Sequence, residues 1–288
     1  MFRAALRLAT PAAIALTAIV AAACVAPAGA VNPSPSPSTG IDPDTVAIRV
    51  DAEGGFVTAG LNLSRLPLVL VTVYGRVITQ GPQDAMYPGP LLPNLQVRTL
   101  TPAVLGDLLH RADADGLLDD ATYAGGPMAD ATTTVLRITV DGVTFSQSAY
   151  ALYESLDANG VELPSDAPDA EGRAAMRSFL DALSGLPDDA YTGDSVPYVA
   201  DAMRVYSSEF VPDPAADWLP VEWPLEDLAR AGESAGDGLG IRCQVVSGED
   251  LSTVLPLLDG ANSATPFRSG GVDYSLIARP LLPGESGC

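Results

Sequence analysis

The chain is 288 residues long and carries 36 acidic residues against 15 basic ones, all of them arginine, for a formal net charge of −21 at neutral pH. This balance argues against nucleic acid or an anionic lipid surface as the ligand, because both require clustered positive charge. One histidine and three cysteines leave too few ligands for an ordinary zinc site.

The N-terminus has the pattern of an export signal. Arg3 and Arg7 supply positive charge, residues 8–20 are apolar, and small residues follow. The apolar run is shorter than the roughly 20 residues that a membrane-spanning helix requires, and Pro11 interrupts it. We therefore expect residues 1–23 to be a signal peptide that is removed.

The next feature is a candidate lipid-attachment site. Residues 21–24 resemble the lipobox of bacterial lipoproteins, although alanine stands at position 21, where leucine is usual. The resemblance implies that Cys24 carries a diacylglyceryl group, with residues 24–45 as a Pro/Ser-rich tether on the outer face of the cell membrane. The alternative is an A-x-A cleavage after Ala30, which would give plain secretion.

Two cysteines remain once Cys24 is assigned to processing. In an oxidising compartment Cys243 and Cys288 are expected to form a disulfide that closes a loop of about 45 residues, worth about 4 kcal/mol in the chain-entropy model. Two free thiols are the alternative, and a reduced, exposed cysteine outside the cell would be prone to oxidation.

The first predicted elements are a hairpin and a helix. Residues 68–74 and 77–78 are apolar and β-branched on either side of Gly75-Arg76, which predicts two paired strands. A helix should begin after Thr101, which can cap it, and end at Gly116. Its apolar face would consist of Val104, Leu105, Leu108, Leu109 and Ala112.

The clearest hairpin in the chain comes next. Residues 134–140 and 143–150 alternate on either side of Asp141-Gly142, a type I′ turn signal. A second amphipathic helix follows and is stopped by Gly185 and Pro187. Its apolar face would contain Met176, Phe179, Leu180 and Leu183.

The last third predicts strands at residues 202–206, 241–246 and 272–278. Ser247 would open a third helix. Its inward face would contain Leu251, Val254, Leu255 and Leu258.

Hairpins mixed with three main amphipathic helices indicate an α+β fold with a largely antiparallel sheet. Acidic residues and prolines gather near residue 190, which suggests an α+β half at 46–190 and a second half at 191–288. The leucine spacing after Thr101 matches that after Ser247, so the two halves could be similar.

One stretch has the form of a catalytic motif. Residues 232–236, Gly-Glu-Ser-Ala-Gly, resemble the nucleophile elbow of carboxylesterases. We reject that function because no buried strand is predicted before the serine. The single histidine, His110, precedes the serine and falls on the exposed face of its helix.

Acidic groups give no specific site either. Residues 113–116 resemble part of an EF-hand loop, but Arg111 and Thr122 occupy positions that calcium ligands need, so a helix C-terminus explains them. Calcium binding elsewhere among the carboxylates stays open. The pairs Asp119-Asp120 and Asp188-Asp189 are expected to serve in turns and caps.

Aromatic residues offer a candidate contact surface. Tyr87 lies in a proline-rich loop, and Trp218 and Trp223 flank a short apolar segment. Core packing is the alternative for all three.

From residue 68 onward the chain resembles a group of uncharacterised secreted lipoproteins of high-GC bacteria, through Tyr87-Pro-Gly-Pro90, Pro93-Asn-Leu-Gln-Val-Arg98, Arg242-Cys243, Arg279-Pro-Leu-Leu-Pro283 and the terminal Cys288. The resemblance implies no activity. In the absence of a catalytic, metal or cofactor pattern, we expect a non-enzymatic binding or interaction protein, held to the membrane by its lipid. The alternative is a cell-envelope hydrolase that uses two carboxylates.

Overall fold

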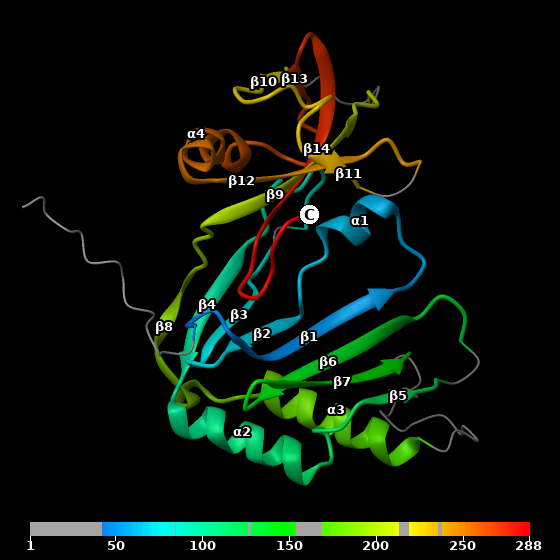
Figure 1. The fold of residues 1–288 in the computed structure, drawn as a ribbon, viewed down its shortest axis with the longest axis vertical. Coiled ribbons are helices and arrows are strands. Elements are labelled where there is room, and N and C mark those ends of the chain that lie inside the picture. The colour runs from blue at the N-terminus through cyan, green and yellow to red at the C-terminus, as the bar shows by residue number, and fades with distance from the viewer. Residues whose placement is uncertain (1–41, 84, 126–127, 154–168, 213–218, 236–237) are drawn as a thin grey trace, which may run out of the picture. The chain divides into compact units, whose positions relative to one another are not determined.

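Two mostly antiparallel β-sheets form the fold in a computed structural model, which describes residues 42–83, 85–125, 128–153, 169–212, 219–235 and 238–288 (Figure 1). Sheet 1 has the strand order β5-β7-β6-β1-β2-β3-β4-β8, and sheet 2 has the order β10-β13-β14-β9-β12-β11. The pairs β5–β7 and β10–β13 are parallel. The fold is therefore α+β, as predicted.

The chain visits sheet 1 before sheet 2. The strands of sheet 1 are β1 (Val46–Gly54), β2 (Val69–Thr72), β3 (Arg76–Gln80), β4 (Leu95–Leu100), β5 (Ala121–Tyr123), β6 (Thr132–Val140), β7 (Val143–Tyr150) and β8 (Tyr191–Pro197). Those of sheet 2 are β9 (Ala202–Glu209), β10 (Val221–Glu222), β11 (Glu233–Ser234), β12 (Arg242–Ser247), β13 (Phe267–Ser269) and β14 (Val272–Pro280). The helices are α1 (Ala59–Ser64), α2 (Pro102–Ala114), α3 (Ala170–Ser184), the single 3-10 turn η1 (Asp188–Ala190) and α4 (Gly248–Asp259).

Helices α2 and α3 lie together against one face of sheet 1 (Figure 1). Their apolar stripes, among them Leu105, Leu108 and Phe179, pack on buried side chains of β1 and β6 such as Ile48 and Leu136. Burial of these stripes is the main force that holds each helix, because isolated helices of this length are marginal in water.

Sheet 2 has its own core, covered by α4. Leu251, Val254 and Leu258 of the helix pack on strand residues such as Met203 and Leu276. None of the described strands after β8 belongs to sheet 1, so the two sheets meet through side chains and loops.

A third apolar cluster joins the two sheets. Leu70 and Ile78, from the face of sheet 1 opposite α2, pack with Leu66 and with Leu282, which follows β14 of sheet 2. Residues 41–288 accordingly form one compact unit.

The predicted elements around the clearest signals are confirmed. β2 pairs with β3, and β6 pairs with β7 across a turn in which Asp141 and Gly142 have φ values of 51° and 78°. The Thr101 hydroxyl accepts a hydrogen bond from the Val104 amide and so caps α2. The strands predicted at 202–206, 241–246 and 272–278 correspond to β9, β12 and β14.

One inward residue was predicted wrongly. Leu255 of α4 is 39% exposed, because Leu251, Val254 and Leu258 occupy the face that meets sheet 2 and Leu255 lies beside it. Its side chain instead lines a small apolar hollow with Tyr198.

The sequence division near residue 190 falls just before β8, which pairs with β4 inside sheet 1. The two similar strand–helix segments also sit in different surroundings. Three strands separate β4 from β6 in sheet 1, whereas β9 alone separates β12 from β14 in sheet 2. None of the described helices is long and apolar enough to cross a membrane.

Candidate functional site

A groove of about 1060 Å³ lies where the two sheets meet. We call it the junction groove. α1 and β14 line one part of it. Another part is lined by Gln80, Pro82, Gln83, Tyr87 and residues 90–94. Its apolar side chains include Leu61, Leu66, Leu68, Leu91, Leu92, Pro93 and Ile277. Its volume is at the upper end of the range typical of small-molecule sites.

A close backbone approach positions α1 beside β14. The helix begins at Thr58, whose hydroxyl accepts a hydrogen bond from the Leu61 amide. At Gly60 an added Cβ would lie 3.2 Å from the Ile277 Cδ1 atom, so the absence of a side chain permits this contact. As a result Leu61, 53% exposed, lies on the rim of the groove.

Arg65 attaches the end of α1 to both sheets. Its guanidinium donates to the Ala52 carbonyl at 2.7 Å and the Gly54 carbonyl at 2.6 Å, both on β1. Its own carbonyl accepts a hydrogen bond from Arg279 of β14. The groove wall is thereby fixed at a point where residues far apart in the sequence converge.

The opposite wall is a loop held by backbone hydrogen bonds. The Gly81 amide donates to Asn94, the Leu91 amide donates to Ala261, and the Ser263 amide donates to Gly89, at 2.7 to 3.1 Å. The first of these bonds closes the loop, and the other two attach it to the segment that follows α4. Tyr87, in this loop, is 79% exposed and lines the groove.

The electrostatic character of the groove differs from that of the whole chain. None of the described lining residues is Asp or Glu, although 36 of the 288 residues in the chain are acidic. The two charged residues in the lining are Arg65 and Arg279. Within the described residues Arg65 forms no ion pair, and the buried Nε–H of Arg279 has no hydrogen-bond acceptor.

The residues after β14, 281–288, form a strap between the sheets, and Glu285 is its central contact. This carboxylate pairs with Arg279 of β14, with Arg49 of β1 at 2.9 Å, and more distantly with Arg204 of β9. Burial alone would raise the pKa of Glu285, but the hydrogen bonds and charges of Arg279 and Arg49 outweigh that effect and hold the pKa below its ordinary value.

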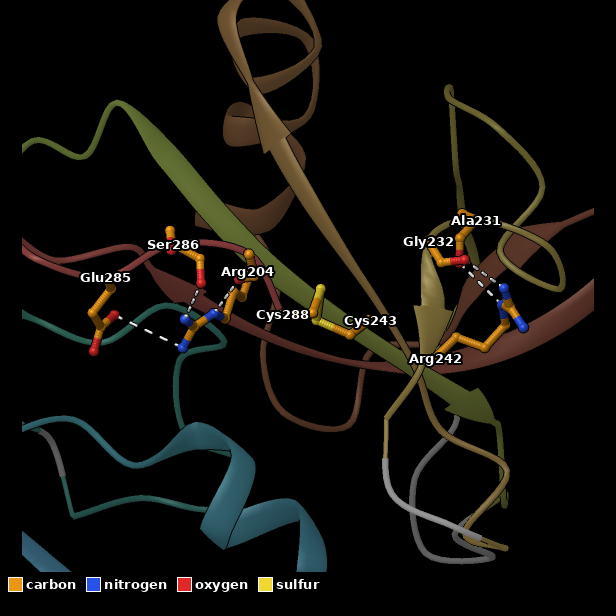
Figure 2. The surroundings of a disulfide bond; sticks show 9 residues. Arg204, Ala231, Gly232, Arg242, Cys243, Glu285, Ser286 and Cys288 are labelled. Carbon is orange, nitrogen blue, oxygen red and sulfur yellow. Dashed lines mark hydrogen bonds and ion pairs between the residues drawn. A yellow bond between two sulfur atoms is a disulfide. The ribbon is translucent and has the colours of Figure 1, made fainter.

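The strap ends at the predicted disulfide, which is confirmed. Cys288 is bonded to Cys243 of β12 (Figure 2). Arg204 donates to the carbonyls of Ser286 and Gly287, so the last residues are also held along their backbone. The last eight residues therefore contact β1 of sheet 1 and β9, β12 and β14 of sheet 2, and so link the two sheets.

Gly232, the first residue of the stretch that resembles a nucleophile elbow, has a structural role. Arg242 donates to the carbonyls of Arg230, Ala231 and Gly232, as Figure 2 shows for the last two. Gly232 has a φ of +64°, and a Cβ there would lie 1.8 Å from the Cys243 carbonyl oxygen. The glycine is required by this close contact.

The described residues around Ser234 do not form a nucleophile elbow. Ser234 is exposed in the two-residue strand β11, and a turn rather than a buried strand precedes it. His110 is exposed on α2, as predicted. The described residues thus place no histidine beside this serine.

The predicted contact surface is only partly assembled. Tyr87 is exposed at the groove, but Trp223 is 6% exposed and packs edge-on against Phe267 in the core of sheet 2. For Trp223 the core role therefore applies, because the indole completes the apolar cluster under α4. Trp218 and Cys24 lie outside the described residues.

The acidic candidates make local contacts. Asp115 ends α2 and pairs with Arg111, so residues 113–116 are a helix C-terminus. Asp120 accepts from the Ser146 amide, and Asp188 pairs with Arg98. Within the described ranges, no three His, Cys, Asp or Glu side chains gather as a metal site would require.

No sequence pattern marks the groove. Helix α1 has six residues, none of them buried, so no apolar periodicity marks it. The Thr58 cap was the available local signal. The approach of α1 to β14 joins residues more than 200 positions apart, which no local pattern reports.

Comparison of the chain with protein-family models, with curated proteins and with solved structures finds no match.

Proposed function

We propose that this protein is a non-enzymatic binding module that works outside the cell, held to the membrane by a lipid on Cys24, with the junction groove as its binding site. The observation that carries the proposal is the groove itself: a hollow of small-molecule size with leucine, isoleucine and proline walls and no acidic residue among those described. The disulfide supports an oxidising location.

The same observation weighs against a hydrolase that uses two carboxylates at this site. Such an enzyme needs two acidic groups facing each other across the cleft, one of them with a raised pKa. The groove lining has no acidic residue among those described. Glu285 and Asp273 both have lowered pKa values. Burial alone would raise the pKa of Glu285, but hydrogen bonds from Arg279 and Arg49 outweigh it. The pKa of Asp273 is lowered by its hydrogen bond from Arg268.

A thermal-shift screen tests the proposal. The full chain, with Cys24→Ser so that it carries no lipid, is screened against neutral and charged amphiphiles, short peptides and cell-wall sugars. A ligand present at 100 times its Kd should raise stability by about 2.7 kcal/mol, which is several degrees.

The position of the site is tested with matched variants. Leu61→Glu places a charge in the groove, while Leu239→Glu changes a leucine of equal exposure, 54% against 53%, that does not line it. We expect Leu61→Glu to remove the shift and Leu239→Glu to keep it. Absence of any shift across the library, or a shift that both variants keep, would overturn the proposal.

A further inference from the structure

We propose that the junction groove takes a single acyl chain that ends in a carboxylate, with the chain along the apolar walls and the carboxylate against the Arg65 guanidinium. This assignment rests on the proposed binding function and specifies its ligand. The occupant is a free amphiphile and not a bilayer surface, because a protein with a net charge of −21 is repelled by an anionic membrane surface.

The apolar part of the ligand is indicated by the walls. Leu61 and Leu68 are 53% and 52% exposed, yet both face the same hollow with Ile277 and Leu92. Single exposed leucines are common on protein surfaces, whereas several that line one groove indicate a site for apolar material. Covering them would remove apolar area from water, which favours binding by about 0.8 kcal/mol per buried CH₂.

The charged part of the ligand is indicated by Arg65. Its two hydrogen bonds, to the carbonyls of Ala52 and Gly54, use two of the five N–H groups of a guanidinium. It forms no ion pair with the described acidic residues. The neighbouring acids Asp51 and Glu53 are paired with Arg49 and Arg137 and not with Arg65, so the Arg65 charge has no carboxylate partner among the described residues. A carboxylate is the planar group that the remaining donors fit.

The other arginine of the groove, Arg279, is already paired, and this decides which end of the groove takes the carboxylate. This arginine also lines the groove, but its charge is already balanced by Glu285 and one of its nitrogens bonds to the Arg65 carbonyl. The groove thus has one cation without a charged partner among the described residues, at the C-terminal end of α1, and its other described walls are mostly apolar. We infer that the carboxylate lies at that end.

The test compares two ligands that share a chain and differ in the head group. Dodecanoate and neutral dodecanoyl glycerol are titrated by calorimetry into the full chain carrying Cys24→Ser, below their aggregation concentrations. The protein as a whole repels anions, so non-specific association favours the neutral ligand. We expect dodecanoate to bind at least about 10-fold more tightly, the effect of a charge-assisted hydrogen bond.

Matched variants then locate the carboxylate. Arg65→Gln should weaken dodecanoate binding about 10-fold more than dodecanoyl glycerol binding, because any loosening of the groove wall affects both ligands alike whereas loss of the charge affects only the carboxylate. Arg230→Gln removes the same charge from an exposed position outside the groove and should change neither. The comparison of head groups on the unmodified groove keeps the test valid even if Arg65→Gln unfolds.

Each other outcome is decisive. Equal binding of the two ligands, with loss of both in Leu61→Glu, would overturn the carboxylate assignment and leave the binding function standing. No binding of either ligand, beside a positive hit elsewhere in the thermal-shift library, would overturn the acyl-chain assignment alone. A preference for dodecanoate that Arg65→Gln keeps would overturn the role of Arg65.

Discussion

Arginine is the residue that cross-links this protein. Arg173 is buried and donates to the carbonyls of Ala124, Tyr150 and Ala151, and Arg242 donates to three successive carbonyls next to β11. A planar guanidinium with five donors can satisfy several carbonyls at once, which an ammonium group on a flexible stem does less well. In a chain without lysine, arginine supplies both structural donors and the few positive charges.

Glu285 should behave as a buried partner of several arginines. Glu285→Gln leaves the charges of Arg279 and Arg49 poorly compensated, so we expect the free energy of unfolding at pH 7 to fall by about 3 kcal/mol, measured by urea denaturation. Glu226→Gln, at an exposed position with no ion pair among the described residues, should change it by less than about 0.5 kcal/mol.

The pH dependence of that difference follows from the sign of the shift. Because the folded-state pKa of Glu285 is lowered from 4.5, its contribution is complete above about pH 4.5 and is lost as the pH falls through the lower folded-state pKa. The gap between the wild type and Glu285→Gln should therefore narrow on acidification below pH 4.5. A gap that widens there would show that the carboxylate is not stabilised by its charge.

Gly232 offers a second test at this scale. Gly232→Ala would place a Cβ against the Cys243 carbonyl in a left-handed conformation, so we expect a loss of at least about 3 kcal/mol in thermal or urea unfolding. Gly240→Ala has a similar φ, +65°, but open space around the Cβ, and should cost about 1 kcal/mol. Equal losses would mean that the close contact is not the cause.

At the scale of elements, the strap of residues 281–288 connects the two sheets. Leu282 fills the cluster between the sheets, Glu285 pairs across them, and Cys288 is bonded to β12. No strand of one described sheet pairs with a strand of the other. The strap is thus a direct link that helps to fix the width of the junction.

The disulfide should contribute to stability through this link. The double change Cys243→Ser and Cys288→Ser opens a loop of 45 residues, and we expect unfolding in urea to become easier by about 4 kcal/mol. Hydrogen exchange of the amides in residues 281–288 should accelerate. Reductant should lower the stability of the wild type to that of the double variant and leave the stability of the variant unchanged. Equal stability of the wild type without reductant and the double variant would contradict the structural role.

Elements with a strong local signal could be predicted from the sequence, and those stabilised by distant contacts could not. Helix α2 has a cap, an N-terminal proline and a continuous apolar stripe, and the turn between β6 and β7 carries Asp-Gly. By contrast, β8 is exposed along nearly its whole length and has no alternation to detect. Trp223 shows the same limit, because only the packing of β13 and α4 decides that it is buried.

At the scale of the whole molecule, the groove depends on contacts between the first and last parts of the chain. Gly60 meets Ile277, and the Arg279 side chain bonds to the Arg65 carbonyl. A site assembled from segments this far apart has no sequence motif of its own. The sequence could predict the class of fold and the disulfide, whereas the groove that we propose as a binding site could be found only in the structure.

The proposed tether is a separate prediction. Intact-mass and peptide mass spectrometry of the protein taken from its membrane should find a diacylglyceryl group on Cys24, because the processed cysteine becomes the N-terminus in lipoproteins. Cys24→Ser should release the protein into the medium. A mature N-terminus at Val31 would contradict the lipid anchor and leave the groove proposal intact.

The most direct test of the binding function is a methyl NMR titration of protein labelled at isoleucine Cδ1. Ile277 lies in the groove wall, whereas Ile138 is buried on the other side of sheet 1, among the residues under α2 and α3. We predict that dodecanoate shifts the Ile277 resonance saturably and leaves that of Ile138 in place. A titration in which Ile277 never moves, with this ligand or with any hit from the thermal-shift screen, would contradict the assignment of the junction groove as the binding site.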